Sequence, residues 1–226
     1  CFITQIYDDK DPYRSNVVEW IKKISLNSKV NNVHILTRYK SEHAFDNKCS
    51  ISSIQSRFKL IRLIKFYIEI FKQVSRNSII FIHMGGPYSV NLFLFKLFFN
   101  TKVYQWWAHP IIGLSTRLGF FLSVDKLFTC TESSFPIKSN KKVVIGHGVN
   151  IKRFPLRNKS KSFKNSLVTA SRLTYRKNIH KMINLIHFMH ENNMGDIFLT
   201  IYGSPLSYKD DLYEKYLNEI IKNTNL

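Results

Sequence analysis

Two cations that stand close together in the sequence could hold a diphosphate. Arg172 and Lys177 belong to the run L-V-T-A-S-R-L-T-Y-R-K-N, in which an apolar strand, a short loop and a helix start follow one another. Both cations would then lie at the carboxyl end of a parallel strand, where open α/β sheets bind their ligands. Fixed cations beside the free N–H groups of a helix start suit a diphosphate. Alternatively, both are solvated loop cations, and the spacing alone does not separate the two interpretations.

The sequence does not support a disulfide framework, a zinc site, a dehydrogenase or a Ser/His/Asp hydrolase. Cys1, Cys49 and Cys130 are widely separated and form no C-x-x-C or metal-ligand spacing, so neither a disulfide framework nor a zinc site is expected. This use of cysteine is consistent with a protein of the reducing cytoplasm. A dehydrogenase is disfavoured because no G-x-G-x-x-G follows the first apolar run, 2–6. A Ser/His/Asp hydrolase is disfavoured because there is no G-x-S-x-G elbow.

The charge of the chain indicates an anionic partner. Its 226 residues include 34 Lys and Arg against 15 Asp and Glu, a formal net charge of +19. Up to Phe154 there are 23 cations and 9 acids, a net +14, and after it 11 and 6, a net +5. A nucleic acid, an anionic membrane surface and a phosphorylated substrate would all be attracted. We expect no nucleic acid partner, because no RRM, KH, zinc-finger or helix-turn-helix signature is present and most aromatic residues lie inside apolar runs.

A basic stripe on one predicted helix is a candidate membrane contact. Within and just after 54–74, Arg62, Lys65, Lys72 and Arg76, with Glu69 between them, recur three or four positions apart on a helix rich in Ile, Leu and Phe. This stripe could rest on the anionic inner leaflet. The alternative is an ordinary helix packed on the sheet with a solvated basic face. No membrane span is expected, because the best candidate, 79–99, is interrupted by His83, Gly85, Gly86, Pro87, Asn91 and Lys96.

The elements that must position these residues form an α/β pattern. Short apolar runs alternate with longer amphipathic stretches, which is typical of βα units on a parallel sheet. Strands are expected at 2–6, 32–37, 78–83, 102–107, 126–130, 142–146, 166–170 and 197–202, and helices around 17–24, 54–74, 89–99, 179–190 and 208–221.

The alternation is interrupted once, which predicts two domains. Residues 1–154 form the first, the polar and basic segment 155–165 is a linker, and 166–226 form the beginning of a second. Two βα units are too few for a self-sufficient parallel domain. The second part therefore either leans on the first or continues beyond this chain, and we expect the chain to be a fragment of a longer gene product.

Motifs in order along the chain give it a resemblance to the glycosyltransferase group 1 family, the retaining nucleotide-sugar enzymes of glycosyltransferase family 4. The run G-V-N-x-x-x-F at 148–154 resembles the family's N-G-V-D-x-x-x-F, and S-R-L followed by Lys177 resembles its G-R-L-x-x-x-K-G. I-Y-G-S-P at 201–205 resembles the next strand and turn. F-I-T-Q-I-Y, W-W-A-H-P and F-T-C-T-E-S resemble three earlier strands of the family.

The resemblance implies a fold and a set of site residues. The fold would be GT-B, with a Rossmann-like, acceptor-side first domain and the first βα units of a second Rossmann-like domain that binds the nucleotide sugar. Arg172 and Lys177 would bind the donor diphosphate and stabilise the leaving group, with no metal required. Gly203 and Ser204 would complete the donor site. His109, also catalytic, would lie in the acceptor-side cleft with Gly85 and Gly86. From their positions alone, His109 could instead be a satisfied strand-end histidine and the glycines could merely make the turn to Pro87.

Departures from the family pattern accompany the matches. The loop after the first strand is D-D-K-D-P-Y-R rather than glycine-rich, and Asn150 and Asn178 replace the usual Asp and Gly. The carboxylate pair E-x-x-x-x-x-x-x-E that such enzymes use for the donor is expected beyond Leu226, while Glu214 and Glu219 read as solvated surface charges.

The function expected is transfer of a sugar from a UDP- or GDP-type nucleotide sugar, with retention, to a cell-surface glycan or lipid-linked acceptor in polysaccharide or lipopolysaccharide biosynthesis. The location expected is the cytoplasm, peripherally on the inner face of the cell membrane. The alternative is a non-catalytic basic module that binds nucleic acid or an anionic membrane.

Overall fold

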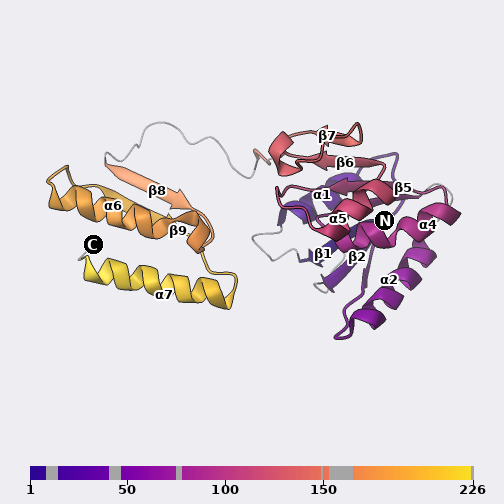
Figure 1. The fold of residues 1–226 in the computed structure, drawn as a ribbon, viewed down its shortest axis with the longest axis horizontal. Coiled ribbons are helices and arrows are strands. Elements are labelled where there is room, and N and C mark those ends of the chain that lie inside the picture. Colours follow the sequence, from indigo (N-terminus) through magenta and orange to yellow (C-terminus); the bar gives the residue numbers. More distant parts are fainter. Residues whose placement is uncertain (9–14, 41–46, 75–77, 149, 153–164, 225–226) are drawn as a thin grey trace. The chain divides into compact units, whose positions relative to one another are not determined.

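The computed structural model describes residues 1–8, 15–40, 47–74, 78–148, 150–152 and 165–224. The chain divides into two compact units, Cys1–Val149 and Asn150–Leu226, and each is described by itself (Figure 1). The expected linker 155–165 lies outside the described residues except for Asn165, and so do Arg76 and Phe154.

Unit 1 contains a seven-stranded sheet in the order β3-β2-β1-β4-β5-β6-β7, and every pairing in it is parallel. The order reverses between β1 and β4, which makes a topological switch point at the carboxyl ends of these two strands. The strands are β1 Phe2–Tyr7, β2 Val33–Lys40, β3 Cys49–Ser53, β4 Ile79–His83, β5 Lys102–Trp106, β6 Lys126–Thr129 and β7 Lys142–Val144.

The helices of unit 1 pack on both faces of this sheet because side chains alternate along each strand. Phe2 joins a core with Val18 and Ile21 of the first helix, whereas its neighbour Ile3 joins the opposite core with Phe66 and Phe120. The helices are α1 Ser15–Ser25, α2 Lys59–Gln73, α3 Gly86–Asn91, α4 Phe93–Phe98 and α5 Leu114–Leu122. A 3-10 turn, η1, covers Glu132–Ser134.

The structure adds two elements to those predicted and divides a third. The short strand β3 and the helix α5 were not expected, and the predicted helix 89–99 is two helices that meet at Leu92. The first of them begins earlier, at Gly86, with Pro87 in its first turn, where the missing N–H of proline costs nothing.

Most of the large apolar side chains of α2 are exposed. Phe66 and Ile70 are the buried residues of this helix. A larger set of its apolar residues has exposed fractions of 44% to 68%: Leu60, Ile61, Ile64, Ile68 and Phe71. The helix therefore carries a second apolar stripe that the sheet does not cover.

Unit 2 contains a two-stranded parallel sheet, β8 Ser166–Ala170 and β9 Phe198–Tyr202. The 3-10 turn η2, Tyr175–Lys177, leads into α6, Ile179–Glu191, and α7, Tyr208–Asn223, packs against α6. Their shared core is small: Leu173, Ile179, Ile183, Tyr213 and Leu217. These elements match the predicted ones to within two residues.

Two further expectations can be compared with the described residues. None of the helices there is both long enough and apolar enough to span a bilayer. The same part of the chain contains no cluster of three or more His, Cys, Asp or Glu side chains that could hold a metal ion, and its cysteines form no disulfide bond.

Candidate functional site

The predicted donor residues of unit 2 meet at the carboxyl ends of its two strands. Ala170 pairs with Tyr202, and beyond them the Ser171 N–H donates to the Tyr202 carbonyl at 2.9 Å. The Leu173 N–H then donates to the Ser204 carbonyl at 3.2 Å. Arg172, between these two bonds, is therefore held beside Gly203 and Ser204 by the backbone.

Gly203 is required at this crossing because there is no space for a side chain. A Cβ atom at this position would lie 2.0 Å from the carbonyl oxygen of Ser171, which is a backbone atom and cannot rotate away. The glycine thus lets the turn after β9 approach the loop after β8 closely. This contact brings together the two loops on which the predicted donor residues lie.

Lys177 stands directly before the start of α6. It ends the turn η2, and Asn178 then adopts the left-handed conformation with φ of 54°. Glycine, and less readily asparagine, occupies this region without large strain. The Asn178 that replaces the family's glycine therefore satisfies the same backbone requirement.

The charges of this strand-end loop are available to a ligand. Arg172 and Lys177 are exposed, and within the described part of the chain neither side chain forms an ion pair. The N-terminus of α6 adds the positive end of the helix dipole. The loop thus combines two cations with a helix N-terminus, and this arrangement attracts phosphate groups.

A tyrosine of α7 holds the start of α6, and the sequence patterns did not indicate it. The hydroxyl of Tyr213 accepts the backbone N–H of His180 at 3.1 Å and lies 2.8 Å from the Nδ1 of the same residue. Tyr175 stacks on the His180 ring with 4.8 Å between centroids. These contacts fix the turn that carries Lys177. The contact could not be predicted from the sequence, because Tyr213 and His180 are too far apart along the chain for any helical or strand periodicity to relate them.

In unit 1, His109 lies in the loop after β5 with a defined ring orientation. Its Nδ1 lies 3.1 Å from the Ile111 nitrogen and 3.4 Å from the Ile111 carbonyl oxygen, so it accepts from the first or donates to the second according to the tautomer. The His109 carbonyl accepts the Trp107 Nε1–H at 2.7 Å. Both of these ring contacts are made by Nδ1, so Nε2 is the ring nitrogen that a ligand would contact.

Gly85 and Gly86 pack the helix after β4 against its neighbour. Both are buried, and a Cβ at Gly86 would lie 2.0 Å from the Oγ1 of Thr116 on α5. A Cβ at Gly85 would lie 2.4 Å from the ring of Tyr88. Gly86 thus allows α3 and α5 to approach each other, Gly85 leaves room for the Tyr88 ring of α3, and contact of the two glycines with an acceptor stays a prediction.

Two histidines and two tryptophans gather at the carboxyl edge of unit 1, and sequence reasoning did not bring them together. Trp20 of α1 lies edge-on to His83 at 5.7 Å and to Trp106 at 5.1 Å, and His147 stacks on Trp106 at 5.9 Å. Burial, with a smaller effect of the His147 charge, lowers the pKa of His83 to about 4. His83 ends β4 at the switch point and is neutral at pH 7. The sequence could have indicated His83 as a site residue only by its position at the end of a predicted strand.

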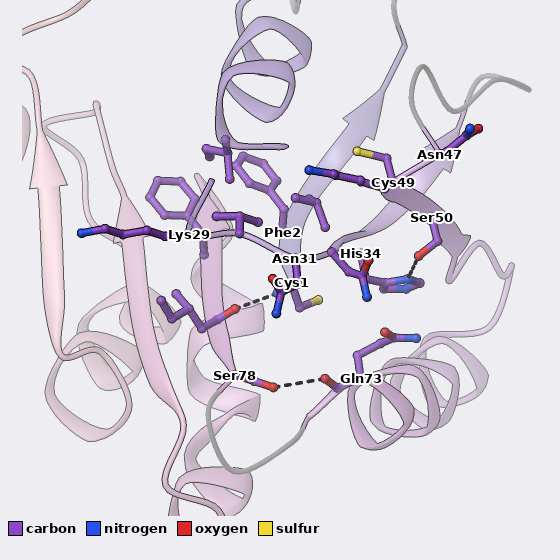
Figure 2. A pocket seen from close by; sticks show the side chains of 17 residues that line it. Cys1, Phe2, Lys29, Asn31, His34, Asn47, Cys49, Ser50, Gln73 and Ser78 are labelled. Atoms are coloured by element: carbon purple, nitrogen blue, oxygen red, sulfur yellow. Dashed lines mark hydrogen bonds between the residues drawn. The ribbon is translucent and has the colours of Figure 1, made fainter. Parts of the chain in front are cut away.

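A cavity of about 600 Å³ lies at the opposite, amino edge of the same sheet (Figure 2). It is lined by residues at the starts of β1, β2, β3 and β4, with His34 Nδ1 2.7 Å from Ser50 Oγ and the Ser78 hydroxyl donating to the Gln73 carbonyl. Open parallel sheets bind substrates at the carboxyl ends of their strands. We therefore assign the candidate site to the carboxyl edges and not to this cavity.

The predicted membrane-contact cations lie on α2 where the structure describes them. Lys65 donates to the Gln55 carbonyl at 3.2 Å, and Lys72 pairs with Glu69 at 2.9 Å. Arg62 is partly buried, and the fourth residue, Arg76, lies outside the described residues.

Comparison with known proteins shows the fold. No family model and no curated protein matches the chain. The structure of Anabaena HepE in complex with UDP is similar with a TM-score of 0.66 and 11% identity, over 100% of this chain and 66% of that one. A trehalose-6-phosphate synthase studied with bisubstrate glycomimetics gives 0.60 and 12%, over 99% and 68%. The UDP-GlcNAc 2-epimerase of Methanocaldococcus jannaschii gives 0.50 and 14%, over 98% and 70%.

These similarities confirm the expected fold class. The chain is a mostly parallel α/β protein of the GT-B type and spans about two thirds of the length of these proteins. The glycosyltransferases among them agree with the resemblance found in the sequence. Because an epimerase shares the fold, fold alone does not distinguish sugar transfer from epimerisation.

Proposed function

We propose that the chain belongs to a retaining glycosyltransferase that transfers a sugar from a nucleotide sugar to a cell-surface glycan or a lipid-linked acceptor. The observation that carries the proposal is the strand-end loop of unit 2, in which Arg172, Lys177 and the Gly203–Ser204 turn adjoin the start of α6. The GT-B fold supports it, as do the UDP-bound and glycomimetic-bound proteins of that fold.

The two cations would stabilise the group that leaves. As the bond from the anomeric carbon to the diphosphate oxygen breaks, the electron pair remains on that oxygen, and negative charge grows there. Fixed cations and the positive end of a helix dipole stabilise such charge without reorganising. The acceptor oxygen then bonds the anomeric carbon on the face that the diphosphate leaves, its proton passes to the diphosphate, and the configuration is retained.

The donor in this proposal is a UDP- or GDP-type nucleotide sugar. Arg172 and Lys177 supply the positive charge that a divalent metal supplies in other phosphate-transfer sites, so the mechanism requires no metal. Gly203 and Ser204 border the phosphates.

The acceptor in this proposal binds at the carboxyl edge of unit 1. The imidazole of His109 offers a hydrogen bond to a sugar hydroxyl, and Trp20 beside the neutral His83 offers an aromatic surface of the kind sugars stack on. Gly85 and Gly86 lie at the same edge, after β4. The process would be polysaccharide or lipopolysaccharide biosynthesis at the inner face of the cell membrane.

The test is turnover of the full-length protein with candidate nucleotide sugars, after calorimetry has identified the donor that binds. We expect Arg172→Ala and Lys177→Ala each to reduce turnover about tenfold or more, because each removes charge that stabilises the leaving group. Lys215→Ala removes an exposed cation of α7 and serves as the matched control. Release of nucleoside diphosphate that depends on the acceptor separates transfer from epimerisation, and the anomeric configuration of the product, read by NMR, tests retention.

Unchanged turnover in both variants would remove these cations from the mechanism. Inversion at the anomeric carbon would exclude the retaining reaction while leaving sugar transfer intact.

A further inference from the structure

An apolar surface in unit 1 is left uncovered by the rest of the unit. Along α2 the exposed side chains recur at i, i+4, i+8 and i+11, and two more follow at i and i+4 on α4. Their exposed fractions are 48% to 79%, which is high for large apolar side chains: Leu60, Ile64, Ile68 and Phe71 on α2, and Leu94 and Phe98 on α4. We call this set the α2–α4 surface. Contiguous exposed apolar areas of this kind mark interaction sites.

The two helices form one continuous surface with a groove between them. Figure 1 shows α2 and α4 on the same side of unit 1, and Tyr67 of α2 stacks on Phe95 of α4 at 5.7 Å. The Tyr67 hydroxyl donates at 3.2 Å to the carbonyl of Asn91, the last residue of α3, which ties α2 to the chain just before α4. The groove has a volume of about 420 Å³ and is lined by these rings together with Phe71 and Phe98. It is a preformed apolar site.

Cations border the apolar stripe on α2. Lys59, Arg62, Lys65 and Lys72 all belong to this helix, and its only acidic residue is Glu69. Glu69 is already paired with Lys72 at 2.9 Å and lies 3.9 Å from His34 Nε2. On α4, Lys96 is paired with Asp125 at 2.6 Å. Lys72 and Lys96 are thus paired with carboxylates, and Lys59, Arg62 and Lys65 leave the border of the surface with an excess of positive charge.

We propose that the α2–α4 surface inserts into the interface of an anionic lipid bilayer. The apolar side chains would lie at the acyl-chain boundary while the cations of α2 bond lipid phosphates, which is the arrangement of interfacial amphipathic helices. Charge selects this occupant over a second copy of the chain, because two such surfaces would bring like charges together. The proposal does not depend on the glycosyl transfer proposed above.

The structure adds an apolar contribution to the predicted membrane contact. The sequence left two interpretations of the basic stripe, a contact with the anionic inner leaflet and a solvated face of an ordinary helix. With Phe71 and Phe98 exposed, apolar insertion contributes as well, and high salt weakens binding without abolishing it.

The experiment is sedimentation of the full-length protein with vesicles of phosphatidylcholine, alone or mixed with phosphatidylglycerol. We expect binding to the mixed vesicles. A double variant, Phe71→Ser with Phe98→Ser, is expected to lower the partition coefficient about a hundredfold, at roughly tenfold for each aromatic ring withdrawn from the interface. Arg62→Gln with Lys65→Gln is expected to lower it about 25-fold, at roughly fivefold for each cation.

The matched control is Leu26→Ser. Leu26 is 78% exposed and lies outside the surface, whereas Phe98 is 79% exposed within it, so the two substitutions remove similar exposed apolar groups. Tryptophan fluorescence and circular dichroism verify that each variant is folded.

Three results would overturn the proposal. The first is absence of binding to mixed vesicles. The second is a double phenylalanine variant that binds like the wild type or like Leu26→Ser. The third is a dimer in sedimentation velocity that the double variant abolishes, together with no binding of the wild-type protein to vesicles. That result would make this surface a contact between copies of the chain.

Discussion

The two units of the chain use positive charge in different surroundings. In unit 2, Arg172 and Lys177 adjoin a tight glycine turn and the N-terminus of α6, whose helix dipole adds to their positive charge. In unit 1, the cations of α2 border exposed aromatic and aliphatic side chains. The two proposals therefore assign the same residue types to a diphosphate in one unit and to a lipid surface in the other, because their neighbours differ.

The units also differ in how they are stabilised. Unit 1 has apolar cores on both faces of seven strands, whereas unit 2 has one small core and depends in addition on the polar contact between Tyr213 and His180. The three tryptophans of the chain, Trp20, Trp106 and Trp107, all belong to unit 1. Tryptophan fluorescence therefore reports unfolding of unit 1 alone, and circular dichroism reports both units.

The largest effect is expected from the core of unit 1. Phe120 is fully buried and lies 4.9 Å from the ring of Phe135. Phe120→Ala is expected to lower the free energy of unfolding by about 3–5 kcal/mol, measured by urea titration with tryptophan fluorescence. Phe121→Ala, at the exposed neighbouring position, is the control and is expected to change it by about 0.5 kcal/mol or less. Equal effects of the two substitutions would contradict a packed core here.

The next effect is a pH dependence confined to unit 1. Burial lowers the pKa of His83 to about 4, so between pH 6.5 and 4 the unfolded chain binds a proton that the folded chain does not. Stability from this group is complete above pH 6.5 and falls with the pH, by about 2 kcal/mol at pH 5. His83→Phe is expected to remove that part of the loss, as seen by urea titrations with tryptophan fluorescence at pH 7 and pH 5. Identical pH dependence in both proteins would show that His83 is accessible to protons.

A smaller effect is expected at the turn that joins the donor loops of unit 2. In Gly203→Ala the new methyl group overlaps the Ser171 carbonyl, and we expect a loss of about 1–3 kcal/mol seen by circular dichroism. Gly113→Ala serves as the control, because no atom lies within 4 Å of its added Cβ. If Gly203→Ala loses no more unfolding free energy than Gly113→Ala, the two loops do not approach each other closely.

The smallest effect tests the polar contact within unit 2. Tyr213→Phe leaves the His180 N–H and Nδ1 without their partner, which is expected to cost about 1–2 kcal/mol. The transition seen by circular dichroism should shift, while that seen by tryptophan fluorescence should not. Tyr216→Phe, at an exposed position of the same helix, is the control. A parallel shift of both signals would show that the two units unfold together.

Much of the secondary structure could be predicted from the sequence, wherever the apolar residues follow the period of a strand or of a helix without ambiguity. The strand 166–170 and the start of the helix at Ile179 were predicted to the residue, because an apolar run ends at a polar loop on each side. The strand β3 was missed because Cys49–Ser53 is short and mostly polar. The predicted helix 89–99 was too long because its apolar residues run unbroken through Leu92, where the structure starts a second helix.

Only those residues of the candidate site that lie at strand ends could be predicted from the sequence. Arg172, Lys177, Gly203 and Ser204 follow strands, and the carboxyl ends of neighbouring parallel strands necessarily meet. The contact of Tyr213 with His180, and of Trp20 with His83, joins residues that are distant in sequence. No periodicity connects such pairs, and only packing brings them together.

The sequence by itself determined the alternation of strands and helices, the strand-end position of the two cations and the excess of positive charge. The tertiary structure alone decided which face of α2 is buried. The helix has two apolar stripes, and its periodicity is the same whichever of them packs on the sheet. Phe66 and Ile70 were selected by the shape of the core beneath them, which left the longer stripe, Leu60 to Phe71, exposed beside its cations.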